Sequence, residues 1–139
     1  MPIPIEVTAA QIDLGQRFDR SVAVVASPAL AAETIICTLT ANTDESITEG
    51  VDLDGWAAYT VGASGTAATL RIRQTNVTGT VIASSGAVTR TAGQLVEHTV
   101  QGFDTAPAAT GQVYVLTLQV TAGAGASTVS ATKLSAMVI

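Results

Sequence analysis

The single histidine, His98, is the residue best suited by type to acid–base chemistry near neutral pH. It lies within Val96-Glu97-His98-Thr99-Val100 and shares alternate positions with Val96 and Val100, so we expect it to point inward from a strand. A catalytic base of the triad type would also need an activated serine and an orienting carboxylate at one pocket. The chain has many serines but no Gly-x-Ser-x-Gly turn. The pattern favours a hydrogen-bonded histidine at a sheet margin over a catalytic or pH-sensing one.

Acidic residues form the densest charge feature, which runs from Asp44 and Glu45 through Glu49 to Asp52 and Asp54. The segment Asp52-Leu53-Asp54-Gly55 resembles a fragment of a calcium-binding loop. The twelve-residue spacing and the terminal glutamate of that loop are absent, however. On a strand, Asp52 and Asp54 would share one exposed face, where carboxylates discourage unwanted strand pairing. The sequence favours this solvated face over a calcium site.

Cys37 is the only cysteine, so it has no partner for an internal disulfide. Alternation in Thr34-Ile35-Ile36-Cys37-Thr38-Leu39 predicts that Ile35, Cys37 and Leu39 point inward and Ile36 outward. We therefore interpret Cys37 as a small buried hydrophobic residue rather than a reactive thiol. No set of residues has the spacing of a catalytic, metal or cofactor site, and we expect none of the three. The chain is not expected to be an enzyme.

The charge balance of −5, with six basic and eleven acidic residues and no basic cluster, argues against a nucleic-acid partner. The N-terminal residues lack the features of a secretory signal, and Pro28 and Glu33 interrupt the most apolar stretch, so no membrane association is expected. Charged residues make up only 12% of the chain, against roughly 25% in a typical domain. This shortage suggests that partners cover part of the surface.

Turn-forming residues recur about every ten positions between segments rich in valine and threonine, a spacing typical of a β-sandwich or barrel. The 139 residues form one domain by length. Strands are expected at residues 5–9, 20–26, 33–41, 47–61 with a bend, 66–75, 79–83, 87–91, 94–102, 112–121 and 127–138. Pro2 and Pro4 favour an extended N-terminal arm, within a possible anchor segment at 1–20.

A β-hairpin is expected around residues 62–65, because one register places all the apolar residues of its two strands on one side. The same register places Trp56 opposite Arg71, and Asp54 opposite Arg73, on the other side. These pairs predict a cation–π contact and a cross-strand ion pair.

The strand at 112–121 carries apolar residues on both sides. Tyr114, Leu116 and Leu118 share one parity and predict a core stripe, while Val113 and Val115 lie on the opposite side. We therefore expect this strand to be covered on both faces, by the second sheet and by something else.

Two parts of the chain carry a resemblance. One part is Val51-Asp52-Leu53-Asp54-Gly55-Trp56-Ala57-Ala58-Tyr59-Thr60-Val61-Gly62 with Leu70-Arg71-Ile72-Arg73; the other is Val113-Tyr114-Val115-Leu116-Thr117-Leu118-Gln119-Val120 followed by residues 127–138. Together they resemble the decoration and head-fibre proteins of tailed-bacteriophage capsids, which are similar in build to the C1q and tumour-necrosis-factor group. The resemblance covers residues 45–139. It implies an all-β fold, an antiparallel jelly-roll β-sandwich, that assembles as a homotrimer and docks on the major capsid protein.

On this resemblance the chain is expected to be a non-enzymatic virion structural protein. It would assemble in the bacterial host cytoplasm and stabilise the capsid from its exterior. The residues expected to contact partners are Pro2, Ile3, Pro4, Ile5, Val113, Val115 and Trp56. One alternative is a receptor-binding or polysaccharide-binding spike module, with Trp56, Tyr59 and the acidic cluster lining a groove. A main shell or tail protein is a further alternative.

Overall fold

The computed structural model describes residues 18–22, 32–43, 49–62, 66–120 and 127–139. Within these ranges all regular structure is β-strand, and no helix that could cross a membrane is found there. The strands are β1 (Phe18–Ser21), β2 (Glu33–Ala41), β3 (Val51–Thr60), β4 (Thr66–Gln74), β5 (Val81–Ser84), β6 (Val88–Arg90), β7 (Leu95–Asp104), β8 (Gln112–Val120) and β9 (Thr128–Val138). The predicted strand at 5–9 and nearly all of the predicted arm lie outside the described residues.

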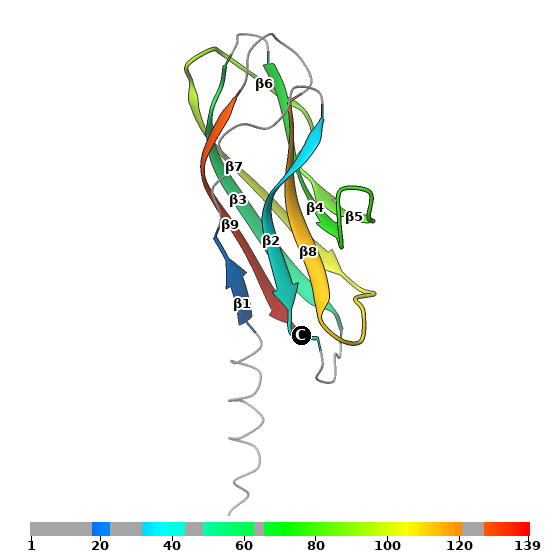
Figure 1. Cartoon of the computed structure of the whole chain (residues 1–139). Helices are drawn as coiled ribbons and strands as arrows, with labels where there is room; N and C mark the ends of the chain where they lie inside the picture. The colour runs from blue at the N-terminus through cyan, green and yellow to red at the C-terminus, as the bar shows by residue number, and fades with distance from the viewer. Residues whose placement is uncertain (1–17, 23–31, 44–48, 63–65, 121–126) are drawn as a thin grey trace, which may run out of the picture.

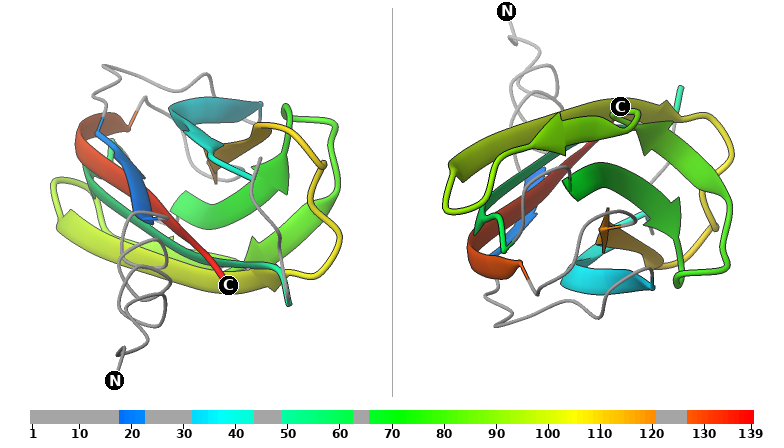
Figure 2. Two further views of the ribbon diagram at one scale, coloured as in Figure 1. Left: turned by 90° about the horizontal axis from the view of Figure 1, so that it is seen from below. Right: turned by 90° about the horizontal axis from the view of Figure 1, so that it is seen from above.

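The strands form two antiparallel sheets that face each other (Figures 1 and 2). The first sheet has the order β1-β9-β3-β7, and the second has the order β2-β8-β4-β5, with β6 added beside β4. As the chain proceeds, most successive strands alternate between the sheets, and the two orders are those of a jelly roll. The predicted antiparallel jelly-roll β-sandwich is confirmed.

The core fills the space between the sheets with the alternate residues that the sequence assigned to it. Tyr114, Leu116 and Leu118 of β8 are completely buried, as the predicted stripe requires. Cys37 is 2% exposed and so occupies the core as expected. Ile36 is also buried, which contradicts its predicted outward position. A register shift between Ile35 and Cys37 explains this, because a bulge breaks the strict alternation.

The predicted hairpin between β3 and β4 is wrong. β3 pairs with β7 and β9, whereas β4 pairs with β8, β5 and β6 in the other sheet. The two strands face each other across the core, so Trp56 and Arg71 lie on opposite outer faces of the molecule. The inward and outward assignments were correct, because alternation fixes which side of a strand is buried but does not identify its neighbour.

Candidate interaction surface

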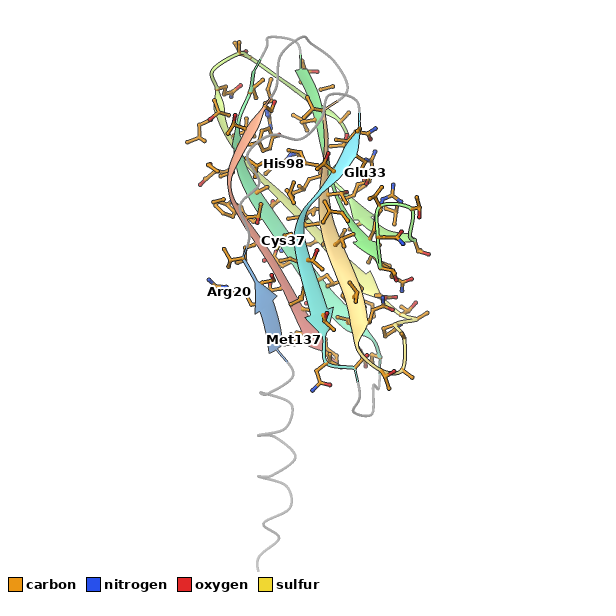
Figure 3. The ribbon with its side chains drawn as sticks, in the orientation of Figure 1. Arg20, Glu33, Cys37, His98 and Met137 are labelled. Carbon is orange, nitrogen blue, oxygen red and sulfur yellow. The ribbon has the colours of Figure 1, made fainter. Side chains whose placement is uncertain are left out.

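His98 lies between the sheets (Figure 3), on β7 at the margin of the first sheet. It is 7% exposed, and its Nδ1 atom is 3.2 Å from the hydroxyl of the fully buried Tyr59. Burial, and then the nearby positive charge of Arg90, lower the pKa of His98. The expected inward orientation is therefore confirmed. Since Tyr59 is inside the core, it is not available to line a surface groove.

The lowered pKa of His98 predicts that the free energy of unfolding falls as the pH decreases from 8 to 5. The unfolded chain, with an ordinary histidine pKa near 6.5, takes up this proton before the folded chain does, so acid favours unfolding. Urea unfolding of the wild type and of His98→Gln, at several pH values in this range, tests the prediction. The variant should show the smaller pH dependence, and equal slopes for the two proteins would contradict the assignment.

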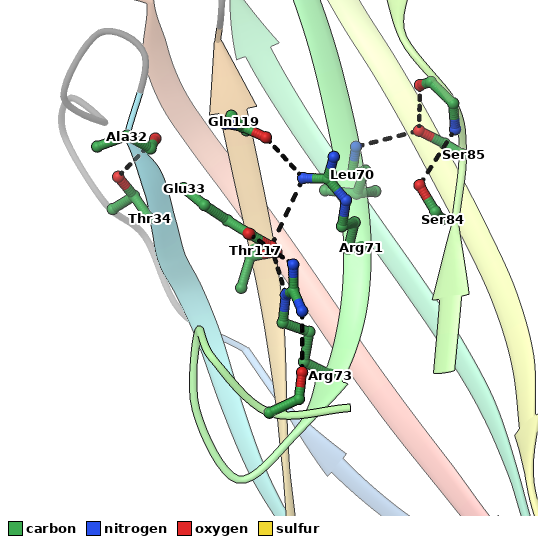
Figure 4. Close-up of polar contacts among 12 residues, drawn as sticks. Ala32, Glu33, Thr34, Leu70, Arg71, Arg73, Ser84, Ser85, Thr117 and Gln119 are labelled. Atoms are coloured by element: carbon green, nitrogen blue, oxygen red, sulfur yellow. Dashed lines mark hydrogen bonds and ion pairs between the residues drawn. The ribbon is translucent and has the colours of Figure 1, made fainter. Parts of the chain in front are cut away.

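The outer face of the second sheet carries a polar network centred on Glu33 (Figure 4). Arg73 donates from Nε to Glu33 Oε1 at 2.7 Å and from Nη2 to Oε2 at 2.8 Å, a bidentate pair. Thr117 donates to the same Oε1 at 2.6 Å, and Arg71 Nη1 lies 3.6 Å from it. Burial would raise the pKa of Glu33, but the hydrogen bonds from Arg73 and Thr117 and the two arginine charges hold it below its usual value.

This network crosses β8, because Glu33 is on β2 and Arg73 on β4, the two strands that flank β8. Beneath it Thr117 is completely buried and Val115 is 1% exposed, whereas Val113 is half-buried. The prediction that this strand is covered on both faces is confirmed at these two buried positions. The cover comes from the chain itself, so Val115 has no side-chain surface to offer a partner in this arrangement.

The outer face of the first sheet is different, and we call it the A face. Strand pairing places outward residues of β9, β3 and β7 side by side in rows across this face. Asp52 lies between Met137 and Phe103, Asp54 between Ser135 and Gln101, and Trp56 between Lys133 and Thr99. Arg20 of β1 extends the middle row beside Ser135 and points away from the sandwich (Figure 3). The A face therefore combines charged, polar and apolar side chains over four strands.

Apolar groups on the A face are well exposed. Phe103 and Met137 are each 42% exposed on either side of Asp52, and Trp56 is half-buried. A shallow depression of about 220 Å³ lies between β3 and β9, lined by Asp52, Asp54, Lys133, Ser135 and Met137 together with Leu53. The A face therefore exposes aromatic and methionine side chains, two kinds of residue that are enriched in protein interfaces.

The predicted contact residues do not form one patch. Trp56 is on the A face, Val113 and Val115 are on the opposite sheet, and Pro2 to Ile5 lie outside the described residues. Asp52 and Asp54 share an outer face as predicted, and the described ranges hold no group of three or more side chains suited to a metal ion.

Sequence reasoning missed Phe103 and Met137. A parity argument could have found Phe103, because it alternates with the buried residues of β7.

The chain matches no known family and no curated protein in sequence. In structure it is similar to a mutant VP2 protein of infectious bursal disease virus, with a TM-score of 0.54, 8% identity and 88% of this chain covered. It is also similar to a chain in the structure of the Gx strain of the same virus, with a TM-score of 0.52, 10% identity and 87% of this chain covered. This chain spans about one third of the VP2 length (32%). The Eiger TNF of S. frugiperda follows with a TM-score of 0.45, 10% identity and coverage of 88% of this chain and 91% of that one. The VP2 likeness supports the fold, a two-sheet β-sandwich.

Proposed function

We propose that this domain is a non-enzymatic structural subunit that attaches to the outside of a bacteriophage capsid as an oligomer and stabilises the shell. The observation that carries the proposal is the A face, where Phe103, Met137 and Trp56 give a broad, partly apolar surface suited to protein partners. About a third of the VP2 chain of infectious bursal disease virus has a similar fold, which is compatible with such a role.

The mechanism is cementing of an assembled shell. A subunit that binds where major capsid proteins meet stabilises the assembled state by mass action, because it does not bind the separated subunits. The N-terminal segment that contains Pro2, Ile3, Pro4 and Ile5 is our candidate for the capsid contact. This assignment places the protein on the virion exterior after assembly in the bacterial host cytoplasm.

Rebinding to capsids stripped of this protein tests the proposed function. The wild type should rebind and raise the temperature at which the capsid opens, whereas Ile3→Asp/Ile5→Asp should lose rebinding and keep the wild-type native mass. A matched control, Thr38→Asp/Thr40→Asp, adds the same charges at exposed positions of β2 and should rebind normally. Wild-type protein that fails to rebind at saturating concentration would contradict the proposal.

A polysaccharide-binding spike module is the second candidate, and one feature favours it. Trp56 lies beside Lys133 at the edge of the depression, where Asp52, Asp54 and Ser135 offer polar groups to a sugar. Binding on a glycan array, lost in Trp56→Ala and retained in Thr38→Asp/Thr40→Asp, would move the assignment to this function.

A further inference from the structure

We infer that the A face is where copies of this chain bind one another, the basic half of one copy against the acidic half of the next. The inference rests on the proposed function only in taking the protein to be an oligomer, and it names the surface that makes the contact. Three observations carry it: the distribution of charge on the A face, its exposed apolar residues and the ion-pair network that already covers the outer face of the other sheet.

The charges of the A face form a basic half and an acidic half, and the boundary between the halves runs parallel to the strands. The half made by β1 and β9 carries Arg20 and Lys133, and the half made by β3 and β7 carries Asp52, Asp54 and Glu97. Within the described residues the ion pairs closer than 4 Å involve Glu33, on the other sheet. Among the described residues, the charges of the A face therefore form no close ion pair with one another, and each half complements the other half of a second copy.

Exposed apolar residues lie on both halves. Met137 belongs to the basic half and Phe103 to the acidic half, with one strand between them. Leu95, which is 65% exposed, also lies on the acidic half. At a strand spacing of about 4.8 Å their backbones are roughly 10 Å apart, so one copy does not bring the two side chains together across Asp52. A second copy that pairs opposite halves can bring Met137 onto Phe103, a favourable sulfur–aromatic contact.

The outer face of the second sheet is less suited to this role. The Glu33 network already satisfies its central charges, and Val115 and Thr117 are buried beneath it. If a partner broke that network, charged groups would be buried at the contact without their ion-pair partners. The A face keeps both its charges and its large apolar side chains accessible.

Two copies can pair opposite halves of the A face when they stack face to face, related by a two-fold axis that runs parallel to the strands. Opposite halves also meet in a closed ring, where each copy contacts one neighbour through its basic half and the other neighbour through its acidic half. The inference therefore holds for either symmetry, including a trimer. Trp56, the only tryptophan, lies beside Lys133 where the two halves meet, so its fluorescence reports contact across the A face.

Charge reversal in the full-length chain tests the inference. Arg20→Glu/Lys133→Glu makes both halves acidic, and Asp52→Lys/Asp54→Lys makes both halves mainly basic. Each pair of substitutions should weaken self-association by about tenfold or more, because like charges then meet. The second pair also moves the net charge closer to zero, so general repulsion would not explain its effect. A variant with all four substitutions exchanges the charges of the two halves, so its self-association should be restored.

Sedimentation over a range of concentrations measures the assembly, and the Trp56 emission should shift to shorter wavelength as copies associate. Circular dichroism verifies that each variant is folded, and Thr38→Asp/Thr40→Asp should associate like the wild type. The inference is overturned if the wild type stays monomeric at all concentrations, if folded reversal variants associate normally, or if the fourfold variant is folded but fails to recover. Capsid rebinding is measured separately. If the wild type rebinds to capsids but its self-association does not depend on these charges, the proposed function stands and only the proposed interface is refuted.

Discussion

Asp104→Ala is expected to lower the free energy of unfolding by about 3–5 kcal/mol, because it removes the acceptor for three hydrogen bonds in a buried place. Asp104 ends β7 and is 3% exposed. Its Oδ2 accepts from the Tyr114 hydroxyl and from Gln74 Nε2, both at 2.7 Å, and its Oδ1 accepts from the backbone NH of Ala106 at 3.0 Å.

Without the carboxylate, the completely buried Tyr114 hydroxyl loses the acceptor of its hydrogen bond. The two sheets are also joined here, since Asp104 belongs to the first sheet and Tyr114 and Gln74 to the second. Burial, together with the hydrogen bond to Asp104 and its charge, raises the pKa of Tyr114, so the hydroxyl stays a donor throughout the physiological range.

Two matched variants make this prediction specific. Asp104→Asn keeps the size and one acceptor oxygen and should cost about 1–2 kcal/mol, and Tyr114→Phe removes one donor and should cost about 1 kcal/mol. Urea unfolding at pH 7, followed by Trp56 fluorescence, gives the three values. A loss for Asp104→Ala no larger than that for Asp104→Asn would contradict the buried-acceptor account.

Gly55→Val is expected to destabilise the chain by about 3 kcal/mol or more, because the sheets approach too closely at Gly55 for a branched side chain. Gly55 lies in the middle of β3 and is buried. A Cβ atom there would lie 2.7 Å from Leu116 Cδ1, 3.2 Å from Val100 Cγ1 and 3.5 Å from Ile72 Cδ1. Valine adds two further methyl groups to that crowding.

The nearest of these atoms ends a flexible side chain, so Gly55→Ala should cost only about 1 kcal/mol as Leu116 shifts. The double variant Gly55→Val/Leu116→Ala should be more stable than the sum of its single variants predicts, because the smaller residue makes room for the larger one. Thermal and urea unfolding of the four proteins form a double-mutant cycle. Strict additivity would show that Gly55 and Leu116 do not compete for space.

Much of the fold follows from alternation. β2 has its predicted bounds, and β8 and β9 match theirs to within one residue, although a bulge interrupts the inward stripe of β2. Strand neighbours did not follow from the sequence: β3 and β4 are adjacent in the chain, and a hairpin explains their apolar residues as well as two facing sheets do. The two arrangements differ in which strands lie beside β3 and β4. These neighbours, β7 and β9 for β3 and β8 for β4, are far away in the sequence.

The candidate surface was predicted only in part, for a related reason. Trp56 was placed outward correctly, and Val115 was correctly placed on the outer side of its strand. Arg73 and Glu33, 40 positions apart, meet across β8 through their long side chains, and Arg73 is the strand neighbour of Val115. Alternation describes the direction in which a side chain leaves the backbone, but not how far a long charged side chain reaches.

The central position of β9 has a consequence for the order in which the newly made chain can fold. β9 lies between β1 and β3, and Val138 pairs with Val51. While the ribosome is still making residues 128–138, the first sheet is divided into two parts whose facing edges have no neighbour. Closure of this sheet therefore waits until synthesis has passed β9, and such distant pairing makes folding slow. Until then, the exposed edges are sites for chaperones or for aggregation.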